Sequence, residues 1–265
     1  MMAANQASEP NYLRFTALKD SSSVTLNNIG TPPDVNLEYR LNGGNWTAYT
    51  YGTTISLDTD DYFEMRNSDD TVVTRLASST SNYRNFAFLG KIAMSGDPFS
   101  LTDKTVANHD LGGYGFLSLF AALTSANQNA LVQIPTMRFG NGAYYSLRGT
   151  FSNCRGLTEA NFILDIIPNT TSVWAATFAS CSGMLRYHFN TIHKGFGRTF
   201  NGNSSCEEFI IDDPNPPTIS SDSITGLKSD CIIYVPDASV DAYKAKQYWD
   251  ARANYIKGIS ERPSN

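Results

Sequence analysis

A short motif that recurs three times constrains the fold of this chain more than any other feature. Each copy begins with Thr-Phe, and the copies are TFSNCRG (150–156), TFASCSG (177–183) and TFNGNSS (199–205). Their phenylalanines, Phe151, Phe178 and Phe200, are 27 and 22 residues apart. A chain that repeats a structural unit stacks the copies, so equivalent side chains form ladders along a shared core. The motif therefore predicts a ladder of phenylalanines.

A second position repeats together with the phenylalanines. The third residue after each Phe is Cys154, Cys181 or Asn203, and an apolar or alternating run follows. Cys is small and buries well, and Asn can pair with backbone groups that are buried in a turn. A period of roughly 20–30 residues with one apolar strand and a Cys-or-Asn position is typical of a leucine-rich-repeat solenoid. We expect the two cysteines to be buried free thiols.

The segments that flank the motif predict how the stack ends. Phe120 marks an irregular first repeat, and the run CIIYVP predicts a last strand. After this strand, Asp237 or Ser239 can cap a helix whose apolar residues include Tyr243 and Trp249. A terminal repeat exposes its core unless another element covers it. We therefore expect this helix to cover the last repeat.

Residues 11–95 follow a different pattern, in which short runs alternate with period two. The runs are YLRFTAL, SVTLNNI, NLEYRL, YGTTISL, DYFEMRN and TVVTRL. Turn-forming stretches such as NGG (42–44) separate them, which predicts a β-sandwich. The chain is thus expected to be mainly β, with an N-terminal tail (1–10), a β-sandwich domain (11–95), a short irregular leucine-rich-repeat solenoid (96–235) and a C-terminal helical cap (236–265).

Parts of the chain resemble a known family of repeat proteins. The stretches TFSNCRGLTEA, IIYVPDASVDAYKA and IKGIS are similar to those of BspA-like leucine-rich-repeat proteins, over roughly residues 115–262. The stretch LEYRLNGGNWTAY resembles the small sandwich that precedes the repeats in some members. The family occurs in Bacteroidales, in other host-associated microbes and in phages that infect them, and its members are typically surface-exposed adhesive proteins. The resemblance therefore implies a binding function outside the cell.

The charge and hydropathy of the chain argue against nucleic-acid and membrane partners. The net charge is −5 and no run of Lys or Arg occurs, whereas binding to a phosphate backbone needs a basic patch. We therefore expect no nucleic-acid partner. No apolar run has the length of a membrane span, so we expect no membrane insertion. The opening MMAANQASEPNYLRF lacks the pattern of a secretory signal, which predicts either a mature form or release by another route.

Residue patterns that carry catalysis or hold a metal are weak in this sequence. No CxxC pair, HExxH spacing or G-x-S-x-G motif occurs. Asp58, Asp60 and Asp61 lie together, but the further ligands of a calcium loop do not follow, so we interpret them as a turn. The carboxylates Glu159, Asp165, Glu207 and Glu208 show no spacing that selects a catalytic pair. We expect no catalytic residue, no metal and no cofactor.

The best candidates for ligand contact are side chains on the outer side of the predicted repeat strands. Alternation places Glu159, Asn161, Arg186 and His188 there. Aromatic residues precede each repeated Phe, and adjacent residues on an extended segment cannot both point inward. At least one of Tyr144 and Tyr145 is therefore expected to be exposed, although burial is the commoner fate in repeats. The candidate binding residues are Tyr145, Glu159, Asn161, Trp174, Arg186 and His188.

These observations favour a non-enzymatic binding or structural protein. Our first hypothesis is a phage virion component, such as a fibre, tail or capsid-associated module, that contacts a bacterial surface or glycan. The alternatives are a bacterial surface adhesin whose signal is removed and a purely architectural virion protein. A carbohydrate-active enzyme is a further alternative. Expected partners are other virion proteins or a bacterial surface glycan or protein, and a homo-oligomer stays open although no heptad pattern argues for one.

Overall fold

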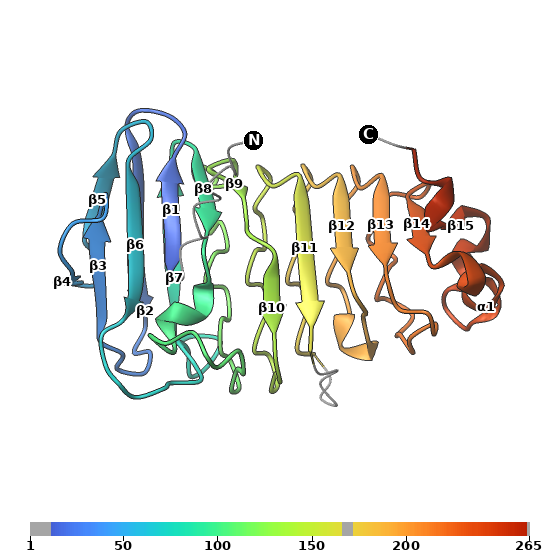
Figure 1. The fold of residues 1–265 in the computed structure, drawn as a ribbon, viewed down its shortest axis with the longest axis horizontal. Coiled ribbons are helices and arrows are strands. Elements are labelled where there is room, and N and C mark those ends of the chain that lie inside the picture. Colours follow the sequence, from blue (N-terminus) through green and yellow to red (C-terminus); the bar gives the residue numbers. More distant parts are fainter. Residues whose placement is uncertain (1–11, 166–171, 264–265) are drawn as a thin grey trace, which may run out of the picture.

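The computed structural model describes residues 12–165 and 172–263, so the expected tail at 1–10 lies outside the described residues. The chain is mainly β, as predicted, and its strands form three sheets. Figure 1 shows the strands side by side along the long axis, with the N-terminal part of the chain at one end and the C-terminal part at the other. No helix in these described ranges is long and apolar enough to cross a membrane.

The N-terminal part contains a mixed six-stranded sheet and a three-stranded antiparallel sheet. The first, in spatial order, is β4 (Thr47–Ala48), β3 (Leu37–Leu41), β6 (Tyr62–Asn67), β1 (Leu13–Ala17), β8 (Ile92–Ser95) and β9 (Leu131–Gln133). The second is β5 (Thr54–Leu57), β2 (Ser22–Ile29) and β7 (Tyr83–Leu89). Phe15 of β1 lies 4.9 Å from Phe86 and 5.2 Å from Phe88 of β7, measured between ring centroids. The two sheets therefore share an aromatic core.

Five of the six alternating runs are strands, and the sixth, TVVTRL at 71–76, is not. Its backbone bonds lead to separate loops, with the Val73 N–H donating to Thr102 and the Leu76 N–H to Gly115. A strand needs successive bonds to one neighbour, so this expectation is wrong. The third strand of the smaller sheet is instead β7, which the alternation analysis missed.

The C-terminal part contains a sheet of six parallel strands. They are β10 (Met137–Phe139), β11 (Glu159–Leu164), β12 (Arg186–Phe189), β13 (Glu208–Ile211), β14 (Ile232–Val235) and β15 (Ile256–Gly258). Parallel neighbours cannot be joined by tight hairpins, so a return segment must lie between them. The return segments also pair with one another: the Leu147 N–H donates to Val173 over 3.0 Å, and the Phe178 N–H donates to Thr199 over 3.0 Å.

The repeated phenylalanines form the ladder that the motif predicts. Phe151, Phe178 and Phe200 are fully buried. Adjacent rings are stacked, with centroid separations of 5.4 Å for Phe151–Phe178 and 6.4 Å for Phe178–Phe200. The ladder continues backward through Phe120, which is 5.3 Å from Phe151, to Phe86 of β7, which is 5.5 Å from Phe120. The N-terminal sheets and the repeats therefore share one continuous core, which crosses the predicted boundary at residue 95.

Hydrogen bonds between repeats explain why Thr precedes the Phe and why Cys or Asn follows it. The Thr hydroxyls donate one repeat back, in the pairs Thr150–Phe116, Thr177–Leu147 and Thr199–Trp174. The third residue after Phe donates to the preceding Phe of the ladder, in the pairs Cys154–Phe120, Cys181–Phe151 and Asn203–Phe178. Each bond gives a backbone carbonyl a side-chain donor from the next repeat, in a core where water is not at hand. The motif is therefore a set of contacts between repeats.

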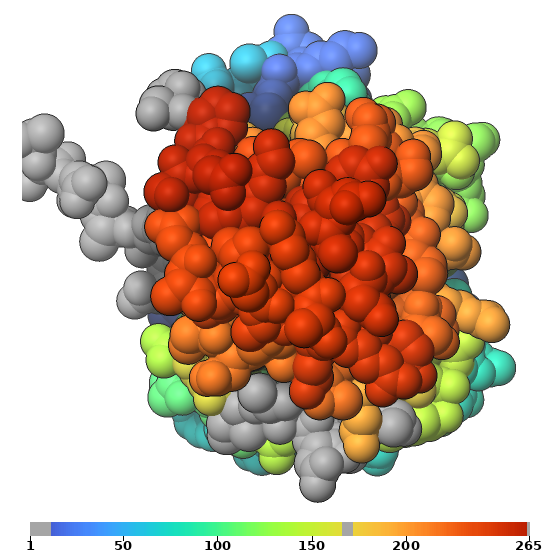
Figure 2. Space-filling view, turned by 90° about the vertical axis from the view of Figure 1, so that its right-hand side faces the viewer, coloured from blue at the N-terminus to red at the C-terminus, as the bar shows by residue number. Residues whose placement is uncertain are grey.

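The C-terminal cap is shorter and less helical than expected. The helix α1 (Val240–Ala245) has six residues, a 3-10 segment covers Asp250–Tyr255, and β15 then adds a strand to the sheet. Tyr243 and Trp249 are fully buried, and Trp249 donates from its indole N–H to the Pro217 carbonyl over 3.0 Å. Figure 2 shows that the C-terminal segments cover this end of the molecule. The predicted covering role is thus performed by two aromatic side chains more than by a long helix.

Candidate binding surfaces

The outer side of the parallel sheet carries a row of charged side chains, one from each of three adjacent strands. Glu159, Arg186 and Glu208 are in register on β11, β12 and β13. Arg186 lies between the two acids, with its Nε 2.6 Å from Glu208 and its Nη1 3.6 Å from Glu159. Burial raises the pKa of Glu208, but hydrogen bonds from Arg262 and Arg186 outweigh it and lower the pKa. The row is therefore an ordered network of charges.

A second row on the same side is polar and less charged. Asn161 and His188 are in register on β11 and β12, and the His188 Nε2 lies 2.9 Å from the Asp212 carboxylate. Asn161, His188 and Asp212 line a shallow hollow of about 360 Å³. A neighbouring hollow of about 240 Å³ is lined by Glu159, Arg186 and Glu208 together with adjacent residues. Four of the six predicted binding residues thus lie together on one face, as alternation predicted.

This polar face ends at β13. The next outward position of the second row is Ile210, which is buried, and its neighbour on β14 is Tyr234, which is also buried. The accessible polar side chains therefore belong mainly to β11 and β12. Two contributors, Glu208 and Asp212, were not among the predicted binding residues. The place of Glu208 in register beside Arg186 could have been found by extending the repeat alignment by one strand, whereas Asp212 lies just after β13 and reaches His188 only through its side chain.

Trp174 does not belong to any surface, which corrects its place among the candidate binding residues. Only 1% of it is exposed. Its indole stacks on Phe196 at 4.7 Å and meets Phe139 edge-on at 5.3 Å. Trp174 lies four residues before Phe178, as Leu147 lies four before Phe151, and both side chains are buried. The residue therefore occupies an inward repeat position, and a longer repeat alignment would have revealed it.

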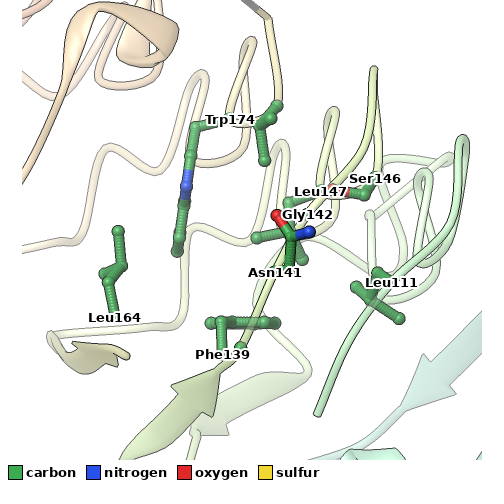
Figure 3. Close-up of a pocket in the computed structure, with 10 residues that line it drawn as sticks. Leu111, Phe139, Asn141, Gly142, Ser146, Leu147, Leu164 and Trp174 are labelled. Atoms are coloured by element: carbon green, nitrogen blue, oxygen red, sulfur yellow. The ribbon is translucent and has the colours of Figure 1, made fainter. Parts of the chain in front are cut away.

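Beside Trp174 lies a small cavity that is nearly closed (Figure 3). Its lining is mostly apolar and includes Leu111, Phe139, Leu147 and Leu164. The buried Ser146 hydroxyl also lines it and has no hydrogen-bond partner among the described residues. The space has about the size of a single water molecule. The cavity is therefore too small for an organic ligand.

Tyr145 lies on a return segment and belongs to a cluster of three tyrosines. Its ring stacks on Tyr144 with a centroid separation of 3.7 Å, and Tyr114 is 5.9 Å away. The Arg148 guanidinium lies 4.4 Å from the centroid of the Tyr145 ring. Tyr144 is 46% exposed, so this cluster reaches the surface. Tyr114 and Arg148 were missed, although Tyr114 precedes Phe120 by six residues as Tyr145 precedes Phe151.

The N-terminal part bears an arginine and aromatic cluster that sequence analysis did not identify. The guanidinium groups of Arg40 and Arg66 lie 4.7 Å and 4.1 Å from the centroid of the Trp46 ring. Glu64 is fully buried there, and it accepts hydrogen bonds from Arg14 and Arg40. Cation–π contacts of this kind hold long side chains in a fixed arrangement. Arg40 and Arg66 lie on the neighbouring strands β3 and β6, and Trp46 lies just before β4, so the cluster depends on strand pairing and not on a local sequence pattern.

The aspartates at 58–61 and the Cys154 thiol have structural surroundings. Asp58 and Asp61 form a turn, in which the Asp61 N–H donates to the Asp58 carbonyl and the Asp58 N–H donates to the Asp61 side chain. Within residues 12–165 and 172–263, no group of three or more His, Cys, Asp or Glu could hold a metal ion. Burial raises the pKa of the Cys154 thiol to about 12, and a buried protonated thiol is a poor nucleophile.

Comparisons with known proteins add no family and no relative. No protein-family model matches the chain, and no curated protein matches it. The resemblance to BspA-like repeats therefore stays a prediction.

Proposed function

We propose that the chain is a non-enzymatic binding protein built from an N-terminal β-sandwich, a short leucine-rich-repeat solenoid and a C-terminal cap. The ladder of stacked phenylalanines and the parallel strands in register support the repeat architecture. The shared core of β1 and β7 supports the sandwich. In such an architecture each repeat contributes one outward strand, so side chains of successive repeats build an extended surface.

We further propose that the protein is a phage virion component, a fibre, tail or capsid-associated module, that contacts a bacterial surface or its glycan. The observation that carries the binding role is the polar face of β11 and β12, where Glu159, Arg186, Asn161 and His188 stand in register beside two open hollows. Arg186 and His188 are already held by carboxylates, which limits their motion. Ordered polar side chains on a rigid sheet bind a ligand with little loss of conformational entropy.

The arrangement favours binding over catalysis for a physical reason. Catalysis gains most from sites that exclude water, because electrostatic interactions strengthen there. The two hollows are shallow and open to solvent, and the one enclosed cavity described above has the size of a water molecule. A bacterial surface adhesin would use the same face for binding. The adhesin and the virion component therefore differ only in where the protein is located.

An architectural virion protein is a second candidate, and the N-terminal cluster favours it. Trp46 is flanked by Arg40 and Arg66, and Tyr12 contacts Trp46 edge-on at 5.3 Å. Trp, Tyr and Arg are the residue types that contribute most to binding at protein interfaces. In this alternative the N-terminal part docks to a neighbouring subunit and the repeats act as a spacer.

The test of the proposal uses the purified, labelled protein and a panel of anaerobic bacteria, with and without their capsular polysaccharide. Capsule-dependent binding that an Asn161→Ala, His188→Ala variant loses is the expected result. A Thr218→Ala variant, changed at an exposed loop residue, serves as control. Mass spectrometry of purified phage particles should detect the chain. If no strain is bound and the chain occurs in particles, the architectural candidate replaces the receptor-binding one; if particles never contain it, the virion assignment fails.

A further inference from the structure

The tyrosine cluster combines exposure with an unusual backbone. Tyr114 and Tyr145 have φ angles of +64° and +58°, in the left-handed region that large side chains rarely adopt. At the equivalent position of the next repeat, six residues before Phe178, the residue with positive φ is Ser172. A left-handed conformation is unfavourable for a residue that carries a Cβ atom. Two tyrosines therefore occupy strained positions where a small residue also fits the fold.

The strain does not stabilise the core, because none of the three rings belongs to it: Tyr114 and Tyr145 are half-buried and Tyr144 is exposed. Tyr144 is 46% exposed, and its ring stacks on that of Tyr145. Tyr114 completes the cluster at 6.3 Å from Tyr144. Strained residues that pack outward tend to be held in place for binding, since the fold itself gains little from them. The cluster presents aromatic faces and phenol groups within a small area, which suits a ligand with both apolar faces and hydroxyl groups.

The chemistry of the site also indicates which ligand class does not fit. A peptide that binds by strand addition needs free backbone groups on the protein. Here the carbonyls of Tyr114, Tyr144, Tyr145 and Arg148 already accept backbone hydrogen bonds from Leu117, Tyr114, Arg148 and Ser118, respectively. Recognition at this site therefore depends on side chains. A sugar ring fits this requirement, because one face of a pyranose carries C–H groups that pack on an aromatic ring.

Arg148 adds a positive charge to the cluster. Its guanidinium lies over Tyr145, and it forms no ion pair with any residue in the described part of the chain. A guanidinium at the edge of an aromatic surface pairs well with a carboxylate, because two parallel hydrogen bonds form. We propose that Tyr114, Tyr144, Tyr145 and Arg148 form a binding site for a carboxylate-bearing sugar, such as a terminal uronic or sialic acid. This inference rests on the proposed binding function and assigns it a site apart from the β11–β12 face.

The experiment uses the full chain and an array that carries uronic-acid- and sialic-acid-terminated oligosaccharides, neutral hexose oligosaccharides and a poly-glutamate peptide. The variants are Arg148→Gln and the double change Tyr144→Ala, Tyr145→Gly, in which glycine accepts the left-handed backbone without strain. The matched control is Tyr248→Ala, because Tyr248 is also exposed and also has a positive φ, of +70°, but lies in the cap. Thermal unfolding of each variant verifies that it is folded.

We expect the wild type to bind acidic sugars in preference to neutral ones. The double tyrosine variant should weaken this binding about tenfold or more without a lower melting temperature, and Arg148→Gln should remove the preference for acidic sugars. Tyr248→Ala should bind as the wild type does. Equal binding by the double variant, or equal binding of poly-glutamate, would overturn the proposed site. If the wild type binds bacterial cells but none of the sugars, this site is wrong and the binding function stands; if it binds neither, both fail.

Discussion

The Cys181 thiol donates a hydrogen bond to the carbonyl of Phe151, which lies one repeat earlier in the chain, over 3.0 Å. Both residues are fully buried. The same bond links Cys154 to Phe120, and Asn203 to Phe178 through its side-chain amide. A buried donor at this position therefore links each of these three repeats to the one before it, and Cys and Asn can both occupy the position because both side chains can donate.

Replacing Cys181 by alanine should destabilise the fold by about 2 kcal/mol, because the buried Phe151 carbonyl loses the thiol donor and keeps only the Cys154 N–H at 3.2 Å. Cys181→Ser keeps a donor and should cost about 1 kcal/mol less. Urea unfolding of the two variants measures the difference. Equal loss of stability in both would mean that packing volume, and not the hydrogen bond, selects Cys at this position.

The threonine of the motif provides a second test of contacts between repeats. The Thr177 hydroxyl lies 2.8 Å from the Leu147 carbonyl of the preceding repeat and 2.7 Å from that of Trp174. Thr177→Val keeps the shape of the side chain and should lower the free energy of unfolding by about 1–2 kcal/mol. Thr158→Val, at an exposed position, is the control and should change it little. A Thr177→Val protein as stable as the wild type would contradict the role of the hydroxyl.

His193 should make the protein sensitive to mild acid. Its Nδ1 accepts a hydrogen bond from the Gly195 N–H, and burial, followed by the charge of Lys194, lowers its pKa from 6.5 to about 4. Between these values the unfolded chain binds the proton and the folded chain does not, so stability is complete above pH 6.5 and falls as the pH decreases toward 4. The loss from this group approaches about 3 kcal/mol.

Chemical denaturation at several pH values measures this loss. The His193→Asn variant retains a side-chain acceptor and should lack this contribution to the pH dependence. The His188→Asn variant is the control, because His188 lies on the outer face beside Asp212 and its change should leave the loss between pH 6.5 and 4 in place. If the free energy of unfolding of the wild type stays constant over this pH range, protonation of His193 does not destabilise the folded protein.

The four cysteines should resist modification in the folded protein. All are buried free thiols, and the sulfur atoms of Cys206 and Cys231 are 3.6 Å apart. The hydrogen bond with Cys231, together with burial, raises the pKa of Cys206, so its reactive thiolate is scarce. A thiol reagent such as Ellman's should label none of them at neutral pH and all four after unfolding in guanidinium. Rapid labelling of the native protein would mean that the repeats open locally.

Several features of the fold and the surfaces could be predicted because they follow from short-range periodicity. The burial of Phe151 and Cys154 follows from the repeat, and the outward direction of Glu159 and His188 follows from alternation along a strand. The burial of Trp174 could also be predicted from the repeat, because Leu147 occupies the equivalent buried position. It was missed because only residues that follow each Phe were aligned. The absence of a strand at 71–76 could not be predicted, because alternation does not reveal whether a partner strand lies beside the run.

The repeated residues can be identified from the sequence, because stacked copies must present equivalent side chains to one core. Which distant residues meet follows only from the tertiary contacts. These contacts join Phe86 to the ladder, bring Tyr114 to Tyr144 and Tyr145, and place Asp212 beside His188. The repeats differ in length, and the return segments and loops contain the extra residues. Contacts across repeats therefore depend on how the backbone of each segment pairs with its neighbour, and spacing along the chain does not predict them.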